Sequence, residues 1–474
     1  MKKNIALGTI LTFVLVAFAF LVITPSVMAQ NNEGLDELKY KQMFEYIYKF
    51  VESYYVDEVS AEQLYEGAMK GMLESLNDPY SSYLTKEEQA NLTDTTKGEY
   101  AGVGLFISKP DPATYDRINP GDKFPQYVKI TAPIEEGPSF RAGLHSGDYI
   151  TKIEGESVVD LDVEEVKNRL RGKEGTKVTF TVMRGSREFD VEITREVIEV
   201  PTVRYTMLEG PRNILGNEKI GYIRIIQFTS HTADRVADAL NEMKSKGYTA
   251  LVIDVRGNPG GLLSSVVDVM DMFLSSGPIV STKSRIAMEN TVFEAHANTT
   301  IVDEKIKVAV LIDEYSASAS EILSGAFKDT KRGFLVGKNT YGKASVQQAR
   351  AIGSAVFKLT VARYYTPNDV NIDKVGVAPD FEVENMKISD DDTKLLNKLL
   401  DARLIEDFVD NNKDPSAQQI RLFISKLEKE GYTLEERILR KLIMQEVYRY
   451  WDFPPIYDLD YDLVLLKAIE ELRK

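Results

Sequence analysis

Residues from Glu196 onward alternate short apolar runs with stretches of helical periodicity. The runs Ile220–Ile225 and Leu251–Val255 are typical of buried strands, and Ala233–Lys246 between them carries apolar side chains at helical spacing. This alternation predicts an α/β core built in layers. In such folds the loops at the strand ends carry the functional side chains. Catalytic or binding residues are therefore expected in those loops.

Small hydroxyl residues occupy one strand-to-helix junction, Ser316–Glu321, which follows the apolar run Val308–Ile312. Backbone N–H groups at a helix start lack partners and favour negative charge. A serine nucleophile placed there would have its oxyanion partly stabilised by geometry. For these six residues taken alone, an ordinary helix N-cap with small packing residues is the simpler interpretation.

The residue types present narrow the choice of catalytic base. The chain has no cysteine and only three histidines, His145, His231 and His296, none of them in an HExxH pair. Thiolate nucleophiles, disulfides and Cys-ligated zinc are thereby excluded, and we expect neither a metal nor a cofactor. A net charge of −15 without a long basic run argues against nucleic-acid binding.

Lys343 follows the predicted strand Phe334–Gly337, in a segment, Lys338–Gln348, that is predicted to be a loop. Burial would lower the pKa of its amine and allow it to act as a base for serine, and Ser–Lys pairs are a known variant of the triad. Gln347 could orient the amine by hydrogen bonding. Two N–H groups could serve as oxyanion donors: that of Ala319, and one from the Gly260–Gly261 turn.

Residues Gly337–Lys343 also match the first seven positions of the phosphate-binding motif GxxxxGK[ST]. That motif next requires Ser or Thr and a helix. This chain has Ala344, and Gln348–Val361 is typical of loop and strand. We therefore expect no nucleotide.

Between Gly98 and Arg195 the pattern changes to short strands and glycine turns. The glycine-led strand Gly102–Ile107, the segment Gly137–Leu144 and the late helix Val163–Arg171 occur in the order that resembles a PDZ domain. PDZ domains bind peptide C-termini by adding a strand to a sheet edge. The resemblance implies substrate contacts at Gly102, Val103, Gly104 and Leu105. A long polar insertion, residues 108–125, interrupts the pattern.

The first 29 residues combine two lysines, an uncharged apolar run from Ile5 to Ile23 and a small-residue site ending at Ala29. This is the pattern of a secretory signal peptide. The run is also close to the ~20 residues that span a bilayer, so a retained membrane anchor stays open. Either alternative exports the remainder of the chain, to the periplasm or another extracytoplasmic compartment, where an uncleaved segment would attach it to the inner membrane.

Both flanks of the α/β core and PDZ-like region are predicted to be helical. Near the N-terminus we expect a helix at residues 61–76 and a further helix capped by Thr85. Near the C-terminus we expect Leu395–Val409 and Leu434–Trp451 to be helices, together with a segment after Ser416. The N-terminal module could form a homodimer or clamp the next domain.

Four segments, taken in order, resemble the carboxyl-terminal processing (tail-specific) proteases of the S41 serine peptidase family. They are Gly67–Leu84, the PDZ-like unit, Asp254–Gly261, and Ser316–Leu323 with Thr340–Gln347. The resemblance covers roughly residues 40–385. It implies a multidomain α/β (α+β) chain with N-terminal helices (35–95), a PDZ domain (97–195), a ClpP/crotonase-like S41 core (196–388) and a C-terminal helical domain (389–474).

By position, the resemblance implies Ser318 as the nucleophile, Lys343 as the general base and Gln347 as its support. It implies the N–H groups of Ala319 and of Gly261, rather than Gly260, as oxyanion donors. Two departures are Ala344, where the family often has glycine, and the long insertion.

The expected function is a serine endopeptidase that captures protein C-termini with its PDZ domain and cleaves near them. The alternative is a non-catalytic, peptide-binding PDZ scaffold of the cell envelope. A third hypothesis is an S41 relative that takes other substrates or needs a partner to become active.

Overall fold

The computed structural model describes residues 33–109, 127–352, 355–384, 389–451 and 455–474. The expected signal peptide or anchor, and nearly all of the polar insertion, lie outside these ranges. The chain forms two units, residues 1–77 and 78–474. Among the helices in the described ranges, none has the length and apolar character that a membrane span requires.

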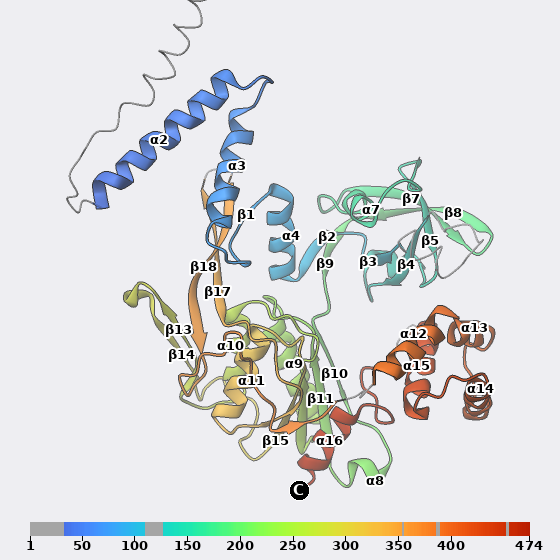
Figure 1. The fold of residues 1–474 in the computed structure, drawn as a ribbon. Helices are drawn as coiled ribbons and strands as arrows, with labels where there is room; N and C mark the ends of the chain where they lie inside the picture. The colour runs from blue at the N-terminus through green and yellow to red at the C-terminus, as the bar shows by residue number, and fades with distance from the viewer. Residues whose placement is uncertain (1–32, 110–126, 353–354, 385–388, 452–454) are drawn as a thin grey trace, which may run out of the picture. The chain divides into compact units, whose positions relative to one another are not determined.

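The first unit contains helices α2 (Glu33–Tyr54) and α3 (Ala61–Glu74) (Figure 1). Ser60 caps α3, because its hydroxyl accepts a hydrogen bond of 3.1 Å from Gln63 N. The helix predicted at residues 61–76 is therefore confirmed, with its end two residues earlier.

The second unit begins with strand β1 (Ser82–Leu84) and helix α4 (Lys86–Lys97). Thr85 caps α4 as predicted. Its hydroxyl accepts from Glu88 N, and the Glu88 carboxylate accepts from Thr85 N, which makes a reciprocal capping box.

The PDZ-like region is an antiparallel sheet with two short helices. Its elements are β3 (Leu105–Ser108), β4 (Val128–Pro133), α6 (Pro138–Arg141), β5 (Tyr149–Ile153), β6 (Glu156–Ser157), α7 (Val163–Leu170), β7 (Lys177–Arg184) and β8 (Arg187–Thr194). Alternate residues Val178, Phe180 and Val182 of β7 are buried in its hydrophobic cluster. A two-stranded ribbon, β2 (Glu99–Gly102) with β9 (Glu196–Glu199), connects this region to the core.

The core has a six-stranded sheet in the order β10-β11-β12-β15-β16-β19, in which only β10 is antiparallel to its neighbour. The strands are β10 (Val203–Met207), β11 (Ile220–Ile225), β12 (Ala250–Asp254), β15 (Lys307–Ile312), β16 (Phe334–Gly337) and β19 (Phe381–Glu382). The strands expected at 220–225 and 334–337 are confirmed to the residue.

Helices cover both faces of this sheet, which explains why its strands read as continuous apolar runs. One face packs against α9 (Thr232–Ser245), α10 (Leu263–Asp271) and α11 (Ala319–Asp329). The other face packs against α8 (Arg212–Leu215) and the last helix, α16 (Leu463–Leu472). Alternate strand residues point to the two clusters, for example Leu251 to one and Val252 to the other. Full burial of each large apolar side chain contributes ~1.5–3 kcal/mol.

A second, antiparallel sheet lies beside the Ser316–Glu321 junction. It comprises β1, β13 (Pro278–Ser284), β14 (Thr291–Glu294), β17 (Ser345–Ile352) and β18 (Ala355–Tyr365); the short 3-10 turn η1 (Ala287–Glu289) lies between β13 and β14. The segment Lys338–Gln348 was predicted to be a loop throughout, which is wrong for its last residues. Gln347 lies on β17 because that strand pairs with β18.

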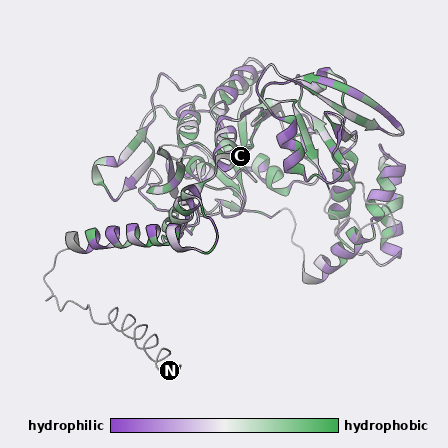
Figure 2. Cartoon of the chain, turned by 90° about the horizontal axis from the view of Figure 1, so that it is seen from above, coloured by the Kyte–Doolittle hydropathy of each residue, from purple (hydrophilic) through white to green (hydrophobic). Residues whose placement is uncertain are grey.

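The C-terminal helices α12 (Asp390–Asp401), α13 (Leu404–Asn411), α14 (Ala417–Lys429) and α15 (Glu436–Tyr448) share one hydrophobic cluster. Green and purple residues alternate along them at the right of Figure 2, as expected for amphipathic helices. The single helix predicted at 395–409 is wrong, because Arg403 adopts a left-handed conformation (φ 52°) that separates α12 from α13. Helix α16, although inside the range 389–474, packs on the core sheet instead.

Candidate active site

Ser318 lies on a sharp turn between strand β15 and helix α11. Its backbone has φ 56° and ψ −114°, a conformation that residues with a side chain seldom adopt. Strained strand-to-helix turns of this kind expose the nucleophilic serine in α/β-hydrolases. The structure therefore places Ser318 where the sequence predicts a strand-to-helix junction, with backbone strain that the sequence did not reveal.

Glu321 is fully buried and joins the Ser318 turn to the lysine loop. One carboxylate oxygen accepts from Ser318 N (2.8 Å) and Lys343 N (2.8 Å). The other accepts from Thr340 Oγ1 (2.7 Å) and Gly342 N (2.6 Å). Four donors saturate the acceptor sites of an ionised carboxylate. Sequence reasoning assigned no role to Glu321, although its position three residues after Ser318 is the spacing of a capping box.

The Lys343 amine lies over the ring of Tyr80, 4.6 Å from its centroid. Burial is the main cause that lowers the pKa of Lys343, and the positive charge of Lys358 acts in the same direction. The carboxylates of Glu321 and Asp78 oppose the shift. Within the described residues, no hydrogen bond joins Lys343 Nζ to Ser318 Oγ.

Tyr80 is held in place by the turn that begins at Asp78. The Asp78 carboxylate accepts from Tyr80 N (3.1 Å) and from the Ser81 hydroxyl (2.6 Å). The Ser81 hydroxyl accepts in turn from Thr360 N on β18 (3.0 Å). The aromatic ring next to Lys343 is thus positioned by a polar turn, a contact that the sequence did not predict.

Gln347 is close to the candidate base in the sequence but is bonded elsewhere. Its side-chain Nε2 donates to Ser345 Oγ (2.8 Å) and Thr360 Oγ1 (3.2 Å). In the part of the chain that the structure describes, it makes no hydrogen bond to Lys343. The Gln347 side chain therefore lies near the site, but it does not orient the Lys343 amine in this arrangement.

Tyr364, on β18, is a further residue of the site that sequence reasoning missed. Its hydroxyl donates to Ser318 O (3.1 Å) and also contacts Lys343 O. Burial is the main cause that raises the pKa of this phenol, which stays a neutral donor. The backbones of the two candidate catalytic residues thus share two buried partners, Glu321 and Tyr364.

The glycine turn after β12 lies directly against Ser318. A Cβ added at Gly260 (φ 104°) would fall 2.7 Å from Ser318 Cβ and 3.0 Å from Ala319 N. Gly260 N already donates to Asn258 Oδ1 (2.8 Å). By contrast, the N–H groups of Gly261 and Ala319 make no hydrogen bond within the described ranges. Neither of these predicted donors is therefore occupied by an acceptor within the described residues.

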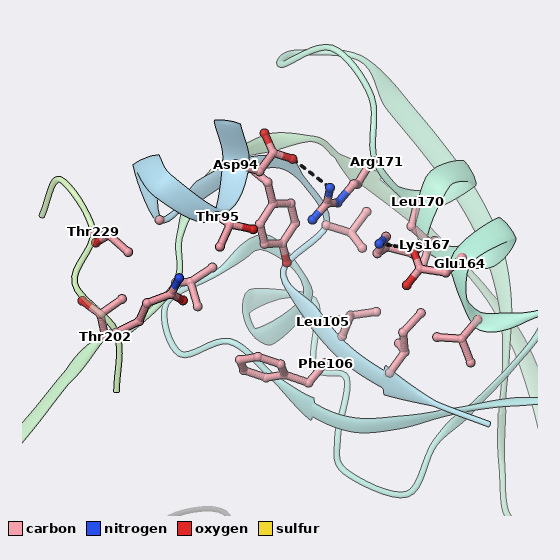
Figure 3. A pocket seen from close by; sticks show the side chains of 17 residues that line it. Asp94, Thr95, Leu105, Phe106, Glu164, Lys167, Leu170, Arg171, Thr202 and Thr229 are labelled. Carbon is pink, nitrogen blue, oxygen red and sulfur yellow. Dashed lines mark hydrogen bonds and ion pairs between the residues drawn. The ribbon is translucent and has the colours of Figure 1, made fainter. Parts of the chain in front are cut away.

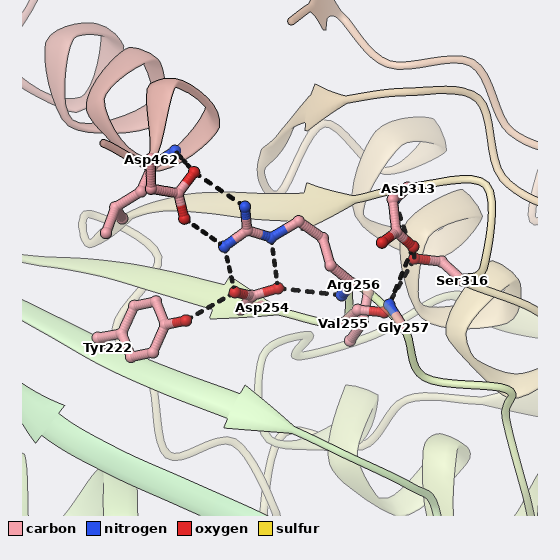
Figure 4. A network of polar contacts seen from close by, with 9 residues as sticks. Tyr222, Asp254, Val255, Arg256, Gly257, Asp313, Ser316 and Asp462 are labelled. Atoms are coloured by element: carbon pink, nitrogen blue, oxygen red, sulfur yellow. Dashed lines mark hydrogen bonds and ion pairs between the residues drawn. The ribbon is translucent and has the colours of Figure 1, made fainter. Parts of the chain in front are cut away.

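The hydroxyl groups of the serines on either side of Ser318 form hydrogen bonds to the backbone around this glycine turn. Ser316 Oγ donates to Val255 O (2.9 Å) (Figure 4), and Ser320 Oγ donates to Asn258 O (3.0 Å). Ala317 N also donates to Asn258 O (3.0 Å). The three serines of the junction thus have different surroundings, and only Ser318 has no such bond to the turn.

A cavity of about 370 Å³ lies along β3 and α7 of the PDZ-like region (Figure 3). Of the residues predicted to contact substrate, Val103 and Leu105 line it, whereas Gly102 and Gly104 do not. The cavity continues to residues of α4 and the core, including Asp94 and Thr229. Its walls are mainly apolar, as is common for ligand pockets.

Arg171 lies at one side of this cavity. Its guanidinium donates to Asp94 Oδ2 (2.8 Å) and stacks over the ring of Tyr100, 4.7 Å from the centroid. Arg171 therefore links the end of α7 to helix α4 beside the groove (Figure 3). Among the described residues, no group of three or more His, Asp and Glu side chains is arranged to hold a metal ion.

Comparisons with known proteins agree with this architecture. Three family models match the chain: an activating protease CtpB N-terminal domain at residues 6–88, a PDZ domain at 129–184 and peptidase family S41 at 219–383. Among solved structures, the photosystem II D1 C-terminal processing protease is 29% identical, with a TM-score of 0.44 over 73% of this chain and 93% of that one.

Curated relatives match over most of their length. A carboxy-terminal-processing protease of Bartonella bacilliformis is 36% identical over 382 residues, which cover 78% of this chain and 81% of the relative. A probable CtpA-like serine protease of Staphylococcus aureus is 32% identical, over 81% of this chain and 72% of the relative. With this similarity spread across the helical, PDZ and catalytic segments, the chain belongs to the S41 family of serine peptidases, among the carboxy-terminal-processing proteases.

Proposed function

We propose that this protein is an endopeptidase that captures protein C-termini in its PDZ groove and cleaves near them with a Ser318–Lys343 pair. One observation carries the proposal: a serine on a strained turn and a half-buried lysine have their backbones joined by a single carboxylate, Glu321. Available N–H donors at Ala319 and Gly261 lie on the same turns. These are the parts that acyl transfer to serine requires.

In the proposed reaction, neutral Lys343 takes the proton of Ser318 Oγ as that oxygen attacks the peptide carbonyl carbon. The tetrahedral oxyanion accepts hydrogen bonds from Ala319 N and Gly261 N. The C–N bond then breaks, and the Lys343 ammonium protonates the leaving amine. Water, deprotonated by the neutral amine, hydrolyses the acyl-enzyme and regenerates Ser318.

The Lys343 amine must move before this reaction begins, because it lies over Tyr80 and not against Ser318 Oγ. After that movement, Gln347 on the adjacent strand could orient it. This arrangement favours the hypothesis of a peptidase that is switched on by substrate or by a partner. Cleavage of a peptide by the purified protein alone, at its full rate and without a lag, would contradict a switch.

Ser318→Ala and Lys343→Ala test the catalytic pair. Both purified variants should bind a C-terminal peptide but lose its cleavage, and Ser318→Ala should no longer react with a fluorophosphonate probe. Lys338→Ala is the matched control, since this exposed lysine of the same segment pairs with Glu384 on the surface. Full cleavage by either catalytic variant would reject the mechanism, and a wild-type protein that binds but never cleaves would support the scaffold alternative.

Capture of C-termini can be tested separately from cleavage. With Ser318→Ala as the binding protein, a peptide with a free C-terminal carboxylate should bind at least tenfold more tightly than its amidated form, as measured by fluorescence anisotropy. PDZ domains hold this carboxylate with backbone N–H groups. Equal binding of the two peptides would reject C-terminal recognition.

Export and self-association are further parts of the proposal. The apolar N-terminal segment supports export, and N-terminal sequencing of the protein from a cell envelope fraction would distinguish cleavage after Ala29 from retention. Helix α2 leaves Phe44, Ile47 and Phe50 about half exposed, which supports a homodimer. Light scattering of wild type and of a triple alanine variant at these positions would test it.

A further inference from the structure

Arg256 connects the glycine turn of the site to the last helix of the chain (Figure 4). It lies two residues after the end of β12 and four before Gly260. Its Nε donates to Asp254 Oδ1 (2.9 Å) and its Nη2 to Asp254 Oδ2 (2.6 Å). On the other side, Nη1 donates to Asp462 Oδ1 (2.9 Å) and Nη2 to Asp462 Oδ2 (2.7 Å). The guanidinium therefore donates two hydrogen bonds to each of two carboxylates, in bidentate geometry.

Asp462 is itself held firmly by helix α16. It is the N-cap of that helix, and its Oδ1 accepts from Leu465 N (3.1 Å). Its residue surface is 9% exposed. The apolar side of α16, including Leu465 and Ile469, is buried against the core sheet. The position of this carboxylate is thus set by the packing of the C-terminal helix.

Asp254 fixes the opposite side of Arg256. It is fully buried, and Tyr222 Oη donates to its Oδ2 (2.6 Å). Burial alone would raise the pKa of this carboxyl, but the Arg256 guanidinium lowers it below the usual value. A buried ion pair adds little net stability compared with apolar packing. A role in positioning explains its presence better than a role in stability.

The backbone that follows Arg256 continues to Gly261, whose N–H group is the candidate oxyanion donor. Gly257 N donates to Asp313 Oδ1 (2.9 Å), and the next residue, Asn258, accepts from the nucleophile junction. The segment from Arg256 to Gly261 is therefore bonded to α16 through Arg256 and to the Ser318 turn through Asn258. Two further bonds hold this segment to the core: Asn258 Nδ2 donates to Ile225 O (3.0 Å), and Phe228 N donates to Gly260 O (2.9 Å). Among these anchors Arg256 is the one that ties the segment to α16, so a shift of its side chain would act on the backbone that continues to Gly261.

We propose that Asp462 is a positioning residue for peptide-bond cleavage, through which helix α16 sets the location of the Gly260–Gly261 turn by holding Arg256. The inference rests on the proposed function, in which Gly261 N binds the oxyanion. Oxyanion donors must lie within 2.7–3.1 Å of the developing charge to be effective. A residue 206 positions away from Arg256 in the sequence would thus control the geometry of that donor.

Asp462→Asn tests this proposal in the full-length protein. Asparagine keeps the helix cap, but its amide NH₂ would face one guanidinium N–H without accepting from it. We expect kcat to fall about 10- to 100-fold, as misplaced catalytic geometry does, while KM stays within twofold. Inhibition by a peptide boronate, which forms a tetrahedral adduct with serine, should weaken by a similar factor.

Two controls separate positioning from loss of structure. Asp458→Asn makes the same chemical change in the same segment, where the carboxylate accepts from Asp460 N and Tyr461 N instead; its kcat should equal that of wild type. Leu240→Ala weakens the packing of α9 on the opposite face of the core sheet, and should lower the melting temperature while leaving kcat within twofold at 25 °C.

A kcat of Asp462→Asn within twofold of wild type would overturn the proposal. A fall in kcat that only tracks melting temperature across Asp462→Asn and Leu240→Ala would also overturn it. If Asp462→Asn does not fold, Asp462→Glu decides in the same way, because it keeps the charge but lengthens the side chain by one methylene. Failure of the proposed function is distinguishable, since wild type itself would then neither cleave peptide nor react with a fluorophosphonate.

Discussion

The two members of the candidate catalytic pair are held very differently. The backbone of Ser318 is fixed by Glu321, by Tyr364 and by the neighbouring glycine turn. The backbone of Lys343 shares the first two partners, but its amine is in contact with the ring of Tyr80 and has no hydrogen bond within the described ranges. The candidate nucleophile and the candidate oxyanion donors are thus preorganised, whereas the candidate base is not.

This difference indicates which part of the site can control the proposed cleavage reaction. A preorganised turn costs nothing further at the moment of reaction. A side chain with four rotatable bonds can instead be moved into or out of position by a small rearrangement. Regulation of this peptidase is therefore expected to act on the Lys343 side chain and not on the Ser318 turn.

The largest effect is expected for Glu321→Gln. This substitution alters the carboxylate that binds the backbones of both Ser318 and Lys343. Only one oxygen remains to accept from four donors, and the amide NH₂ faces at least one of them. We expect a loss of about 2–4 kcal/mol in the free energy of unfolding, since each unsatisfied buried donor costs ~1–3 kcal/mol, together with loss of cleavage. Thermal unfolding and peptide cleavage measure the two effects. Wild-type activity would show that the shared carboxylate is dispensable.

A smaller effect, confined to the preorganised side, is expected for Gly260→Ala. The new methyl group would lie 2.7 Å from Ala317 O and Ser318 Cβ, so the turn must shift away from the nucleophile. We expect kcat to fall roughly 100-fold. Gly257→Ala is the matched control, because its φ is also positive (70°) but nothing lies within 4 Å of the added Cβ. Equal kcat values for these two variants would contradict a steric role of the Gly260 contact.

The smallest effect, on the side of the candidate base, is expected for Tyr80→Leu. An aromatic face stabilises the ammonium form of lysine by ~0.5–2 kcal/mol, so its removal lowers the pKa of Lys343 further. Neutral base then persists to lower pH, and the acid limb of the kcat/KM profile should move down by roughly 0.4–1.5 pH units. The charges of Lys358, Glu321 and Asp78, which also act on this amine, are unchanged in the variant.

Tyr80→Phe is the control for that shift, since it keeps the ring and should leave the acid limb where it is in wild type. A profile of Tyr80→Leu that coincides with wild type, or that moves to higher pH, would show that the ring contact does not tune the base. A change in KM alone would point to a substrate contact instead.

Local structure was largely predictable because it depends on near neighbours in the chain. The strands at 220–225, 334–337 and 355–365 follow from apolar and β-branched runs. The cap at Thr85 follows from its spacing to Glu88. Errors occurred where local signals are weak: a left-handed Arg403 split a predicted helix, and Gln347 joined a strand whose partner comes later in the sequence.

By itself, the sequence determined the class of fold, the order of the segments and the candidate residues Ser318, Lys343 and Gln347. Only the tertiary structure decided which polar groups are buried together. Glu321 receives donors from 19 to 22 residues away, and Arg256 meets a carboxylate 206 residues away. Local patterns report the preferences of a backbone segment, but the partner of a buried charge is chosen by the packing of distant elements.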